Sequence, residues 1–191
     1  MKLFEIWGRI KFWRLADRMG PDIPYTHWRL HFKSTMLTLC KSKFKYFCDS
    51  AEFRPGAYAI GCSKISLGQR VIIRPGNMLF ADPREGGAEI TIEDDVMLGA
   101  GVHIYVHNHR FDDPDIPIIE QGFYPSAPVT LKKGCWVGAN VIVLPGVTIG
   151  ENTVVGAGSV VTKSLPDRVL AVGNPAKAIR KIGEPNNADY A

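Results

Sequence analysis

Apolar residues recur along the chain with two different periods, and the change falls near residue 53. Beyond it, aliphatic residues recur every six positions, and the residue that follows is often glycine. A six-residue unit is too short for a pair of helices and suits one short strand followed by a tight turn. Three such units make a triangular coil, and stacked coils make a solenoid whose aliphatic side chains share one narrow core. The period runs through Leu67, Ile73, Leu79, Ile92, Leu98, Ile104, Leu131, Val137, Val143, Ile149, Val155 and Val161.

Before residue 53 the pattern predicts helices. Apolar residues there recur at intervals of three and four, which is the spacing of one helix face. A break follows at Gly20-Pro21 and Pro24, and residues 26–47 are expected to form a second helical stretch. The stripe of the first helix consists of Leu3, Ile6, Trp7, Ile10 and Trp13.

Two interruptions of the six-residue period predict where the chain leaves the coils. The first falls after Leu79 and predicts a bulge around Arg84-Glu85-Gly86-Gly87. The second is much longer and rich in proline, and it predicts a loop over residues 105–128. Loops carried on a rigid scaffold are where functional residues concentrate. Three of the five histidines lie at the start of this loop: His103, His107 and His109.

These patterns divide the chain into three parts. We expect a helical N-terminal segment over residues 1–52 and a mainly β solenoid over 53–172, with the excursion loop at 105–128. A short C-terminal helix and a polar tail are expected over 173–191.

Composition and charge narrow the class of protein. No apolar run is long enough to span a membrane, and the N-terminus lacks the unbroken apolar stretch of a secretory signal. The four cysteines show no C-x-x-C spacing, so a cytoplasmic protein with reduced thiols is expected. Residues 1–50 hold ten Lys and Arg against four Asp and Glu, a net charge of +6. This excess is typical of a solvated helix face, or of contact with an anionic partner such as a membrane surface.

The second half of the chain resembles a known family. The tract VLPGVTIGENTVVGAGSVVTKSLP, followed by VGNPAKAIRKI, is similar to the hexapeptide-repeat acyltransferases, among them the maltose, galactoside and bacterial polysaccharide O-acetyltransferases. The resemblance covers about residues 60–182. It implies a left-handed parallel β-helix, a homotrimer, and acetyl-CoA as the acyl donor. The left-handedness rests on the resemblance alone, because crossovers between parallel strands are generally right-handed.

Acyl transfer to a hydroxyl needs a base that takes the hydroxyl proton. Histidine suits this role because its ordinary pKa of about 6.5 lies near working pH. No G-x-S-x-G tract is present, so direct transfer without an acyl-enzyme is the simplest mechanism. The resemblance matches the family's catalytic histidine to His109, which follows Asn108, and leaves His107 as the reserve. His103 is interpreted as a surface residue.

The resemblance also implies binding residues. The positions that match the family's contacts to the acyl donor are Trp136, Gly138, Ala139, Ala157, Gly158, Thr162, Lys163 and Arg180. The phosphates of the donor need cations, and Lys177 is available for them beside Lys163 and Arg180. Those assigned to the acceptor are Arg74, Asp82, His107, Asn108 and Tyr124. Arg74 stands where the sugar enzymes carry an amide residue, and this departure would suit an anionic acceptor.

The sequence therefore predicts an acetyl-CoA-dependent O-acetyltransferase that acts on a sugar, nucleotide sugar or glycan. N-acetylation of an amino sugar, O-acetylation of serine and a non-catalytic β-helix scaffold remain alternatives. His107-x-His109 with Asp112 or Asp113 suggests a metal site, but it offers too few ligands at fixed spacing. No histidine follows His109, as a γ-type carbonic anhydrase would need. No metal and no nucleic acid are expected.

Overall fold

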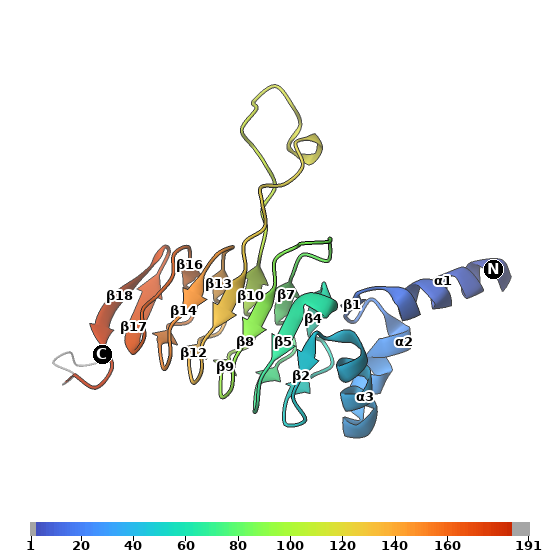
Figure 1. Ribbon diagram of the computed structural model, residues 1–191, viewed down its shortest axis with the longest axis horizontal. Helices are drawn as coiled ribbons and strands as arrows, with labels where there is room; N and C mark the ends of the chain where they lie inside the picture. Colours follow the sequence, from blue (N-terminus) through green and yellow to red (C-terminus); the bar gives the residue numbers. More distant parts are fainter. Residues whose placement is uncertain (1–2, 185–191) are drawn as a thin grey trace.

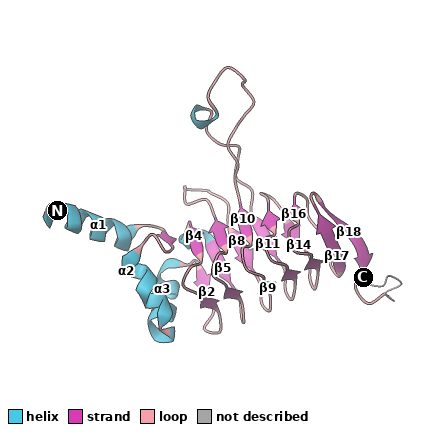
Figure 2. Cartoon of the chain, turned by 180° about the vertical axis from the view of Figure 1, so that it is seen from behind, coloured by secondary structure: helices cyan, strands magenta, loops and turns pink. Residues whose placement is uncertain are grey.

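The structure, a computed structural model, describes residues 3–184. A triangular β-helix forms the body, short helices cover one of its ends, and a single long loop rises from its middle (Figure 1). The same arrangement is seen from behind in Figure 2, where helices and strands separate clearly along the length of the molecule.

The N-terminal segment contains four short helical elements. These are α1 (Leu3–Leu15), α2 (Pro24–His27), the 3-10 helix η1 (Trp28–His31) and α3 (Lys33–Lys43). The apolar stripe at the start of the chain does form a helix, but none of its residues is buried. None of the described helices is long and apolar enough to cross a membrane.

The second predicted helical stretch ends earlier than residue 47. After α3 the chain turns, and β2 (Tyr46–Phe47) pairs in parallel with a strand of the β-helix. Phe44 directs this change, because its ring packs 5.5 Å, centroid to centroid, from both Phe47 and Phe53. The burial of three aromatic side chains against the first coil therefore outweighs continuation of the helix. The first strand of the β-helix lies before residue 53.

The strands form the three faces of a left-handed β-helix, which we call faces A, B and C. Face A contains β1 (Arg18–Met19), β4 (Tyr58–Ile60), β7 (Met78–Phe80), β10 (His103–Tyr105), β13 (Ile142–Val143) and β16 (Val160–Val161). Face B contains β2, β5 (Ile65–Leu67), β8 (Ile90–Ile92), β11 (Val129–Leu131) and β14 (Thr148–Ile149). Face C contains β9 (Met97–Leu98), β12 (Trp136–Val137), β15 (Val154–Val155), β17 (Val169–Gly173) and β18 (Ala176–Lys181). The pair β3 (Glu52–Phe53) and β6 (Ile72–Ile73) precedes β9.

The six-residue period predicted from the sequence is confirmed in the register. On face A, for example, Leu79, Ile104, Val143 and Val161 are successive partners in parallel pairs, and all four are buried. Each aliphatic residue thus stacks on its equivalent in the next coil. A single coil would expose this core at both ends, so the stability of each coil depends on its neighbours.

The chain makes two kinds of connection at the corners between these faces. From face C to face A the chain makes short turns, such as residues 99–101, 138–140 and 156–158. From face A to face B it makes connections of variable length, including residues 81–89 and the loop between β10 and β11. We call these edges the C–A corner and the A–B corner. The long loop therefore leaves from the A–B corner.

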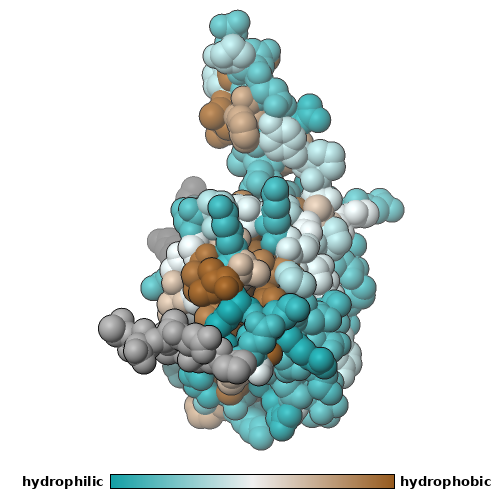
Figure 3. All heavy atoms as spheres, turned by 90° about the vertical axis from the view of Figure 1, so that its left-hand side faces the viewer, coloured by the Kyte–Doolittle hydropathy of each residue, from teal (hydrophilic) through white to brown (hydrophobic). Residues whose placement is uncertain are grey.

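The C-terminal helix expected from residue 173 is wrong for the described part of the chain. Residues 176–181 form β18, which folds back antiparallel onto β17. Ala176, Ile179 and Ile182 are three residues apart, a spacing that also fits a helix. The open edge of β17 instead offers unpaired backbone groups that a strand can satisfy. The polar tail over 185–191 lies outside the described residues. The surface at this end is mainly hydrophilic, with hydrophobic side chains gathered near its centre (Figure 3).

Candidate active site

The base of the long loop is a short antiparallel stem. His109 and Phe123 are bridge partners, and the Arg110 N–H donates to the Gly122 carbonyl at 3.0 Å. The Tyr124 N–H donates to the carbonyl of Asn108, also at 3.0 Å. These backbone bonds hold the first residues of the loop in an extended conformation just outside the A–B corner.

Two histidines of the stem pack on one aromatic ring. The Phe123 centroid lies 4.1 Å from the His109 ring and 5.0 Å from the His107 ring. In an extended segment residues two apart face the same side, which brings both imidazoles to this ring. His109 is exposed, while His107 is half-buried. Burial lowers the pKa of His107, and the charges of Arg84 and His109 oppose its protonation further, against the opposite effect of Asp82.

An ion pair lies beside the two histidines, in the bulge that the sequence placed after Leu79. Asp82 is only 2% exposed, and Arg84 donates to it from Nε at 2.8 Å and from Nη2 at 2.7 Å. The guanidinium lies 5.3 Å from the centroid of the Phe123 ring. Hydrogen bonds from Arg84 hold the pKa of Asp82 well below its usual range. Asp82 is therefore a charged group that fixes Arg84.

A glycine makes this bulge possible. A Cβ atom at Gly87 would lie 2.4 Å from the carbonyl oxygen of Asp82 and 2.7 Å from its Cγ. Only glycine lets the backbone pass so close to the carboxylate. The Gly87 N–H also donates to the Arg84 carbonyl at 2.9 Å, which closes the turn that presents the arginine.

Tyr124 and Asn108 lie on the stem without contacting His109 through their side chains. The Tyr124 hydroxyl donates to Asp112 at 2.5 Å, and its ring packs against Phe111 and Arg110. Asn108 is exposed. His103 is half-buried on face A, where its Nδ1 lies 3.3 Å from the Tyr105 hydroxyl. Of the stem's aromatic residues, Phe123 and not Tyr124 is the neighbour of His109.

Most of the residues assigned to the acyl donor gather at the C–A corner. Trp136 is half exposed at the edge of face C, and Gly138 and Ala139 follow it in the turn. A Cβ atom at Gly138 would lie 2.6 Å from the Ala157 nitrogen of the next coil. The turns are therefore stacked backbone to backbone, with exposed small residues at Ala157 and Gly158. This surface has room for a thin ligand to approach the main chain.

Arg74 also lies at the C–A corner, where its Nε donates to the Leu98 carbonyl at 3.3 Å. It lines a groove of about 500 Å³ together with Trp136, Met97 and Gly99. Within one chain the structure therefore places Arg74 beside Trp136 and not beside Asp82.

The cationic residues divide between two places. Thr162 and Lys163 are exposed at the A–B corner, two coils beyond the long loop. Lys177 and Arg180 lie on β18, where Lys177 is the partner of Val172. The Val172 side chain reaches within 2.7 Å of where a Cβ atom at Gly156 would stand, so Lys177 lies close to the C–A corner.

Within one chain, the histidines and the small-residue turns are on different edges of the triangle. Face A lies between them, and the four residue steps from Val102 to Val106 span about 13 Å of extended chain. None of the described contacts joins His107, His109 or Phe123 to residues 136–140 or 156–158. Nor do three or more His, Cys, Asp or Glu side chains within residues 3–184 form a group that could hold a metal ion.

Comparison with known proteins agrees with this geometry. The family model for the bacterial transferase hexapeptide (six repeats) matches residues 128–163. The galactoside O-acetyltransferase of Escherichia coli is 32% identical over 153 residues, which are 80% of this chain and 71% of that protein. A Schizosaccharomyces pombe relative is 48% identical over 95 residues, but these are 50% of this chain and 44% of that protein.

Comparison of the fold with solved structures indicates the same family. A galactoside acetyltransferase solved in complex with coenzyme A superimposes with a TM-score of 0.71 and 26% sequence identity, over 96% of this chain and 95% of that one. The chain belongs to the hexapeptide-repeat acetyltransferases. Among the sequence-based expectations, this family membership and the left-handed β-helix are confirmed.

Sequence reasoning missed two residues of this candidate site. Arg84 was recognised only as part of a bulge, although a charged residue beside two glycines in an interrupted coil is itself a signal. Phe123 gave no signal, because its contact with His109 depends on how the two arms of the loop pair.

Proposed function

We propose that this acetyltransferase transfers the acetyl group of acetyl-CoA to a hydroxyl of a sugar, nucleotide sugar or glycan, with His109 as general base. The observation that carries the proposal is the placement of His109. Its imidazole is exposed at the root of the loop and packs against Phe123, 4.1 Å away between ring centroids. A base held by an aromatic ring and open to solvent can meet an incoming hydroxyl.

The reaction then has two steps that balance without an acyl-enzyme. His109 takes the hydroxyl proton while the oxygen attacks the thioester carbonyl, which gives a tetrahedral oxyanion. When this intermediate collapses, the carbon–sulfur bond breaks and the imidazolium returns the proton to the CoA thiolate. A positioned general base contributes about 10²–10⁴ to the rate.

The C–A corner is the proposed donor site. Its stacked turns place small residues in successive coils, so a pantetheine arm can reach the backbone there. Trp136 offers an exposed ring beside the turns, and Lys177 offers a cation for the phosphates. Thr162, Lys163 and Arg180 remain proposed contacts, and the first two would have to come from a different edge of the triangle.

The separation of the two corners supports a homotrimer. If one site needs both His109 and the C–A turns, and a single chain holds them on different edges, a neighbouring chain must supply one of them. A closed trimer about an axis along the β-helix would bring the A–B corner of each protomer to the C–A corner of the next. Three identical sites result, and Arg74 of one protomer would face the acceptor side of its neighbour.

Arg84 favours an acceptor with negative charge. Asp82 occupies Nε and Nη2 of the guanidinium, and Nη1 makes no hydrogen bond to any residue of the described range 3–184. The guanidinium carbon and the His109 ring centroid are no more than 9.4 Å apart, because 5.3 and 4.1 Å separate them from the shared Phe123 centroid. A sugar bound at His109 could therefore place a carboxylate or phosphate on Arg84.

The deciding experiment is a thiol-release assay with acetyl-CoA. The acceptors should be neutral sugars, acidic sugars, nucleotide sugars, amino sugars and serine. Release of CoA with a sugar hydroxyl supports the proposal, whereas release only with an amino sugar or serine supports N-acetylation or serine acetylation. A chain that binds acetyl-CoA but acetylates no acceptor would favour the scaffold.

We propose a cytoplasmic location. All four cysteines, Cys40, Cys48, Cys62 and Cys135, are free, and burial raises the pKa of the Cys40 and Cys135 thiols to about 12. Free thiols of this kind fit a reducing compartment.

A further inference from the structure

Helix α1 carries a large apolar surface that nothing in the described chain covers. Phe4 is 86% exposed and Trp7 72%, and Leu3 and Leu15 are similarly open. Large exposed apolar patches on a folded protein mark contact surfaces. The helix projects from the end of the β-helix, away from both corners of the active site (Figures 1 and 2).

The exposed side chains of α1 line a groove of about 700 Å³. Phe4, Trp7 and Leu15 supply apolar walls, and Lys11 and Arg14 supply cations. Lys and Arg beside exposed aromatic side chains suit a membrane surface, because their apolar stems can lie with the aromatic rings while their charged heads reach the headgroups. At 13 residues the helix is about 20 Å long, so it is suited to lie on a bilayer and too short to span one.

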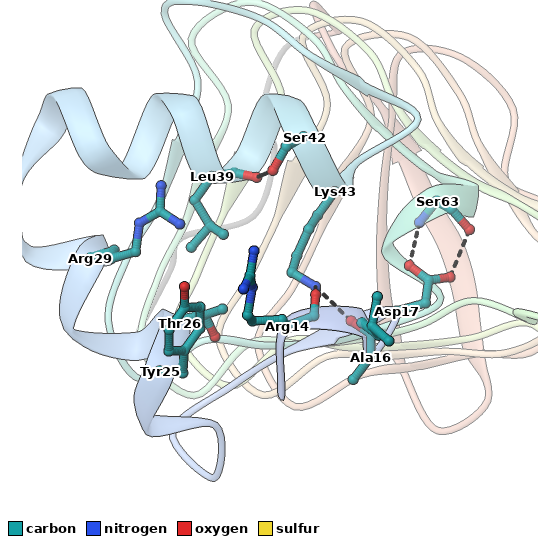
Figure 4. Close-up of a pocket in the computed structure, with 11 residues that line it drawn as sticks. Arg14, Ala16, Asp17, Tyr25, Thr26, Arg29, Leu39, Ser42, Lys43 and Ser63 are labelled. Carbon is teal, nitrogen blue, oxygen red and sulfur yellow. Dashed lines mark hydrogen bonds between the residues drawn. The ribbon is translucent and has the colours of Figure 1, made fainter. Parts of the chain in front are cut away.

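A cationic cavity of about 510 Å³ adjoins this groove at the end of α1 (Figure 4). Three cations line it, Arg14, Arg29 and Lys43, against one carboxylate, Asp17. Asp17 is already bound, because it accepts from the Ser63 N–H at 2.8 Å and from the Ser63 hydroxyl at 2.6 Å. The cavity therefore has an excess of positive charge.

The two arginines of the cavity have unused donors. Within residues 3–184, neither the Arg14 nor the Arg29 guanidinium makes a hydrogen bond or an ion pair, whereas Lys43 donates from Nζ to the Ala16 carbonyl at 2.6 Å. In Figure 4 the Arg14 side chain reaches between Tyr25 and Lys43, and Arg29 lies on the opposite side of Tyr25. Two such guanidinium groups lining one cavity fit a phosphate.

Arg14 and Leu15 line both hollows, so the apolar groove and the cationic cavity share a wall. We propose that these two adjoining hollows together bind an anionic phospholipid of a membrane surface. The lipid phosphate would lie between Arg14 and Arg29, and the acyl chains would lie along Phe4, Trp7 and Leu15. Binding would hold the β-helix against the membrane through its helical end.

The competing occupant is another copy of this chain. Two α1 helices are poorly matched, because each carries Arg9, Lys11 and Arg14 against a single acid, Glu5. Residues 1–50 as a whole have a charge of +6, so contact between two such segments brings like charges together. An anionic bilayer complements the same charges, and each Lys or Arg near its surface strengthens binding roughly fivefold.

Vesicle binding by the full chain tests the proposal. The probes are vesicles of phosphatidylcholine alone and of phosphatidylcholine mixed with phosphatidylglycerol. We expect binding only to the anionic vesicles, with weakening as salt is raised. Arg14→Gln with Arg29→Gln should lower the partition coefficient roughly ten- to thirtyfold. Trp7→Ser should lower it about tenfold and reduce the blue shift of tryptophan emission on binding.

Matched control variants distinguish binding at this site from a general effect of positive charge or exposed apolar surface. Arg54→Gln with Arg168→Gln removes two arginines outside the N-terminal segment, and Ile179→Ser removes an exposed apolar side chain from β18. These variants should bind anionic vesicles within about twofold of wild type. Thermal melting of every variant shows that it is folded. Arg14→Lys with Arg29→Lys keeps both charges but loses the planar guanidinium groups, so it should lower the binding roughly threefold to fivefold, less than the Gln pair does.

Three results would overturn the proposal: no binding to anionic vesicles, equal binding to neutral ones, or equal loss in the control variants. A molecular mass that is higher for vesicle-free wild type than for Trp7→Ser would also overturn it, because a neighbouring chain would then cover α1. CoA release with a small sugar acceptor should be unchanged in the Arg14, Arg29 and Trp7 variants. Failure of acetyl transfer in the wild type would therefore be distinguishable from failure of lipid binding.

Discussion

The ring of Phe123 lies against the ring of His109, 4.1 Å between centroids and 35° from coplanar. The two residues come from opposite arms of the long loop and are backbone bridge partners. Phe123 thereby fixes the face of the imidazole and leaves its outer edge to solvent. Positioning of this kind matters for catalysis, because a small displacement of a general base is costly.

Replacement of His109 by Ala should lower kcat for acetyl transfer by about 10²–10⁴, with acetyl-CoA affinity unchanged. The reason is that the hydroxyl proton loses its acceptor while the C–A turns stay intact. Steady-state CoA release and calorimetry with acetyl-CoA measure the two effects. His103→Ala is the matched control, since His103 lies on face A against Tyr105. A His109→Ala chain that keeps more than about a tenth of the wild-type kcat would refute the assignment, and a larger loss in His107→Ala would move the role to His107.

The six-residue period of the aliphatic residues is enough to predict the coils. Each of these residues faces the one shared core, and a shift in strand register would move its side chain to the surface. The C-terminal hairpin was not predictable in this way. AKAIRKI fits both a helix and a strand, and the choice depends on the open edge of β17, which exists only after the last coil has formed.

In the candidate site, too, some residues could be predicted from the sequence and others could not. His109 and Asp82 could be selected because they stand at interruptions of the repeat, where the chain must leave the coil. The position of Arg74 in the repeat grouped it with Asp82 as an acceptor residue. The two lie at different corners, because Arg74 follows β6 and precedes face A, whereas Asp82 follows β7 of face A. Phe123 and Arg84 meet His109 only through tertiary contacts of the folded loop.

Asp82→Asn should destabilise the protein at neutral pH, because Arg84 loses its charged partner. Hydrogen bonds from Arg84 lower the pKa of Asp82 in the folded protein, so this contribution is fully present above the unfolded carboxyl value of about 3.9. It is lost as pH falls further, through the lower pKa of the folded state. Thermal melting of wild type and Asp82→Asn from pH 7 to pH 2 should therefore give curves that converge at acid pH. A gap that stays constant or widens toward low pH would contradict the role given to the carboxylate.

Arg84→Gln should discriminate between acceptors by their charge. If Arg84 binds an anionic group, kcat/KM for an acidic sugar such as galacturonate should fall roughly tenfold to a hundredfold, mainly through KM. Transfer to neutral galactose should change by less than about threefold. Arg54→Gln is the matched control, because Arg54 also pairs with a carboxylate two residues away, Glu52, at 2.9 Å. Equal losses for both sugars would mean that Arg84 only holds Phe123 and the loop in place.

Removal of metal ions should leave acetyl transfer unchanged. Within residues 3–184 no third His, Cys, Asp or Glu side chain joins His107 and His109 in a group that could hold a metal ion. A catalytic zinc site needs three protein ligands around one point. The measurement is CoA release before and after dialysis against a strong chelator. Activity that is lost on dialysis and restored by zinc would contradict direct transfer with His109 as the base.

Assembly can be tested with two inactive variants. His109→Ala removes the base at the A–B corner, and Ala157→Trp should block the exposed turn at the C–A corner without a change in the core. Each variant alone should be inactive. If every site takes His109 from one chain and the turn from the next, each mixed trimer has one interface at which both residues are intact. Three quarters of randomly mixed trimers contain both chains, and each of these has one intact site out of three. One site in four should therefore be active, which gives roughly a quarter of the wild-type activity. The two chains are unfolded together and refolded, and light scattering checks the mass. A monomer excludes shared sites, and mixed trimers that remain inactive mean that one chain supplies both residues.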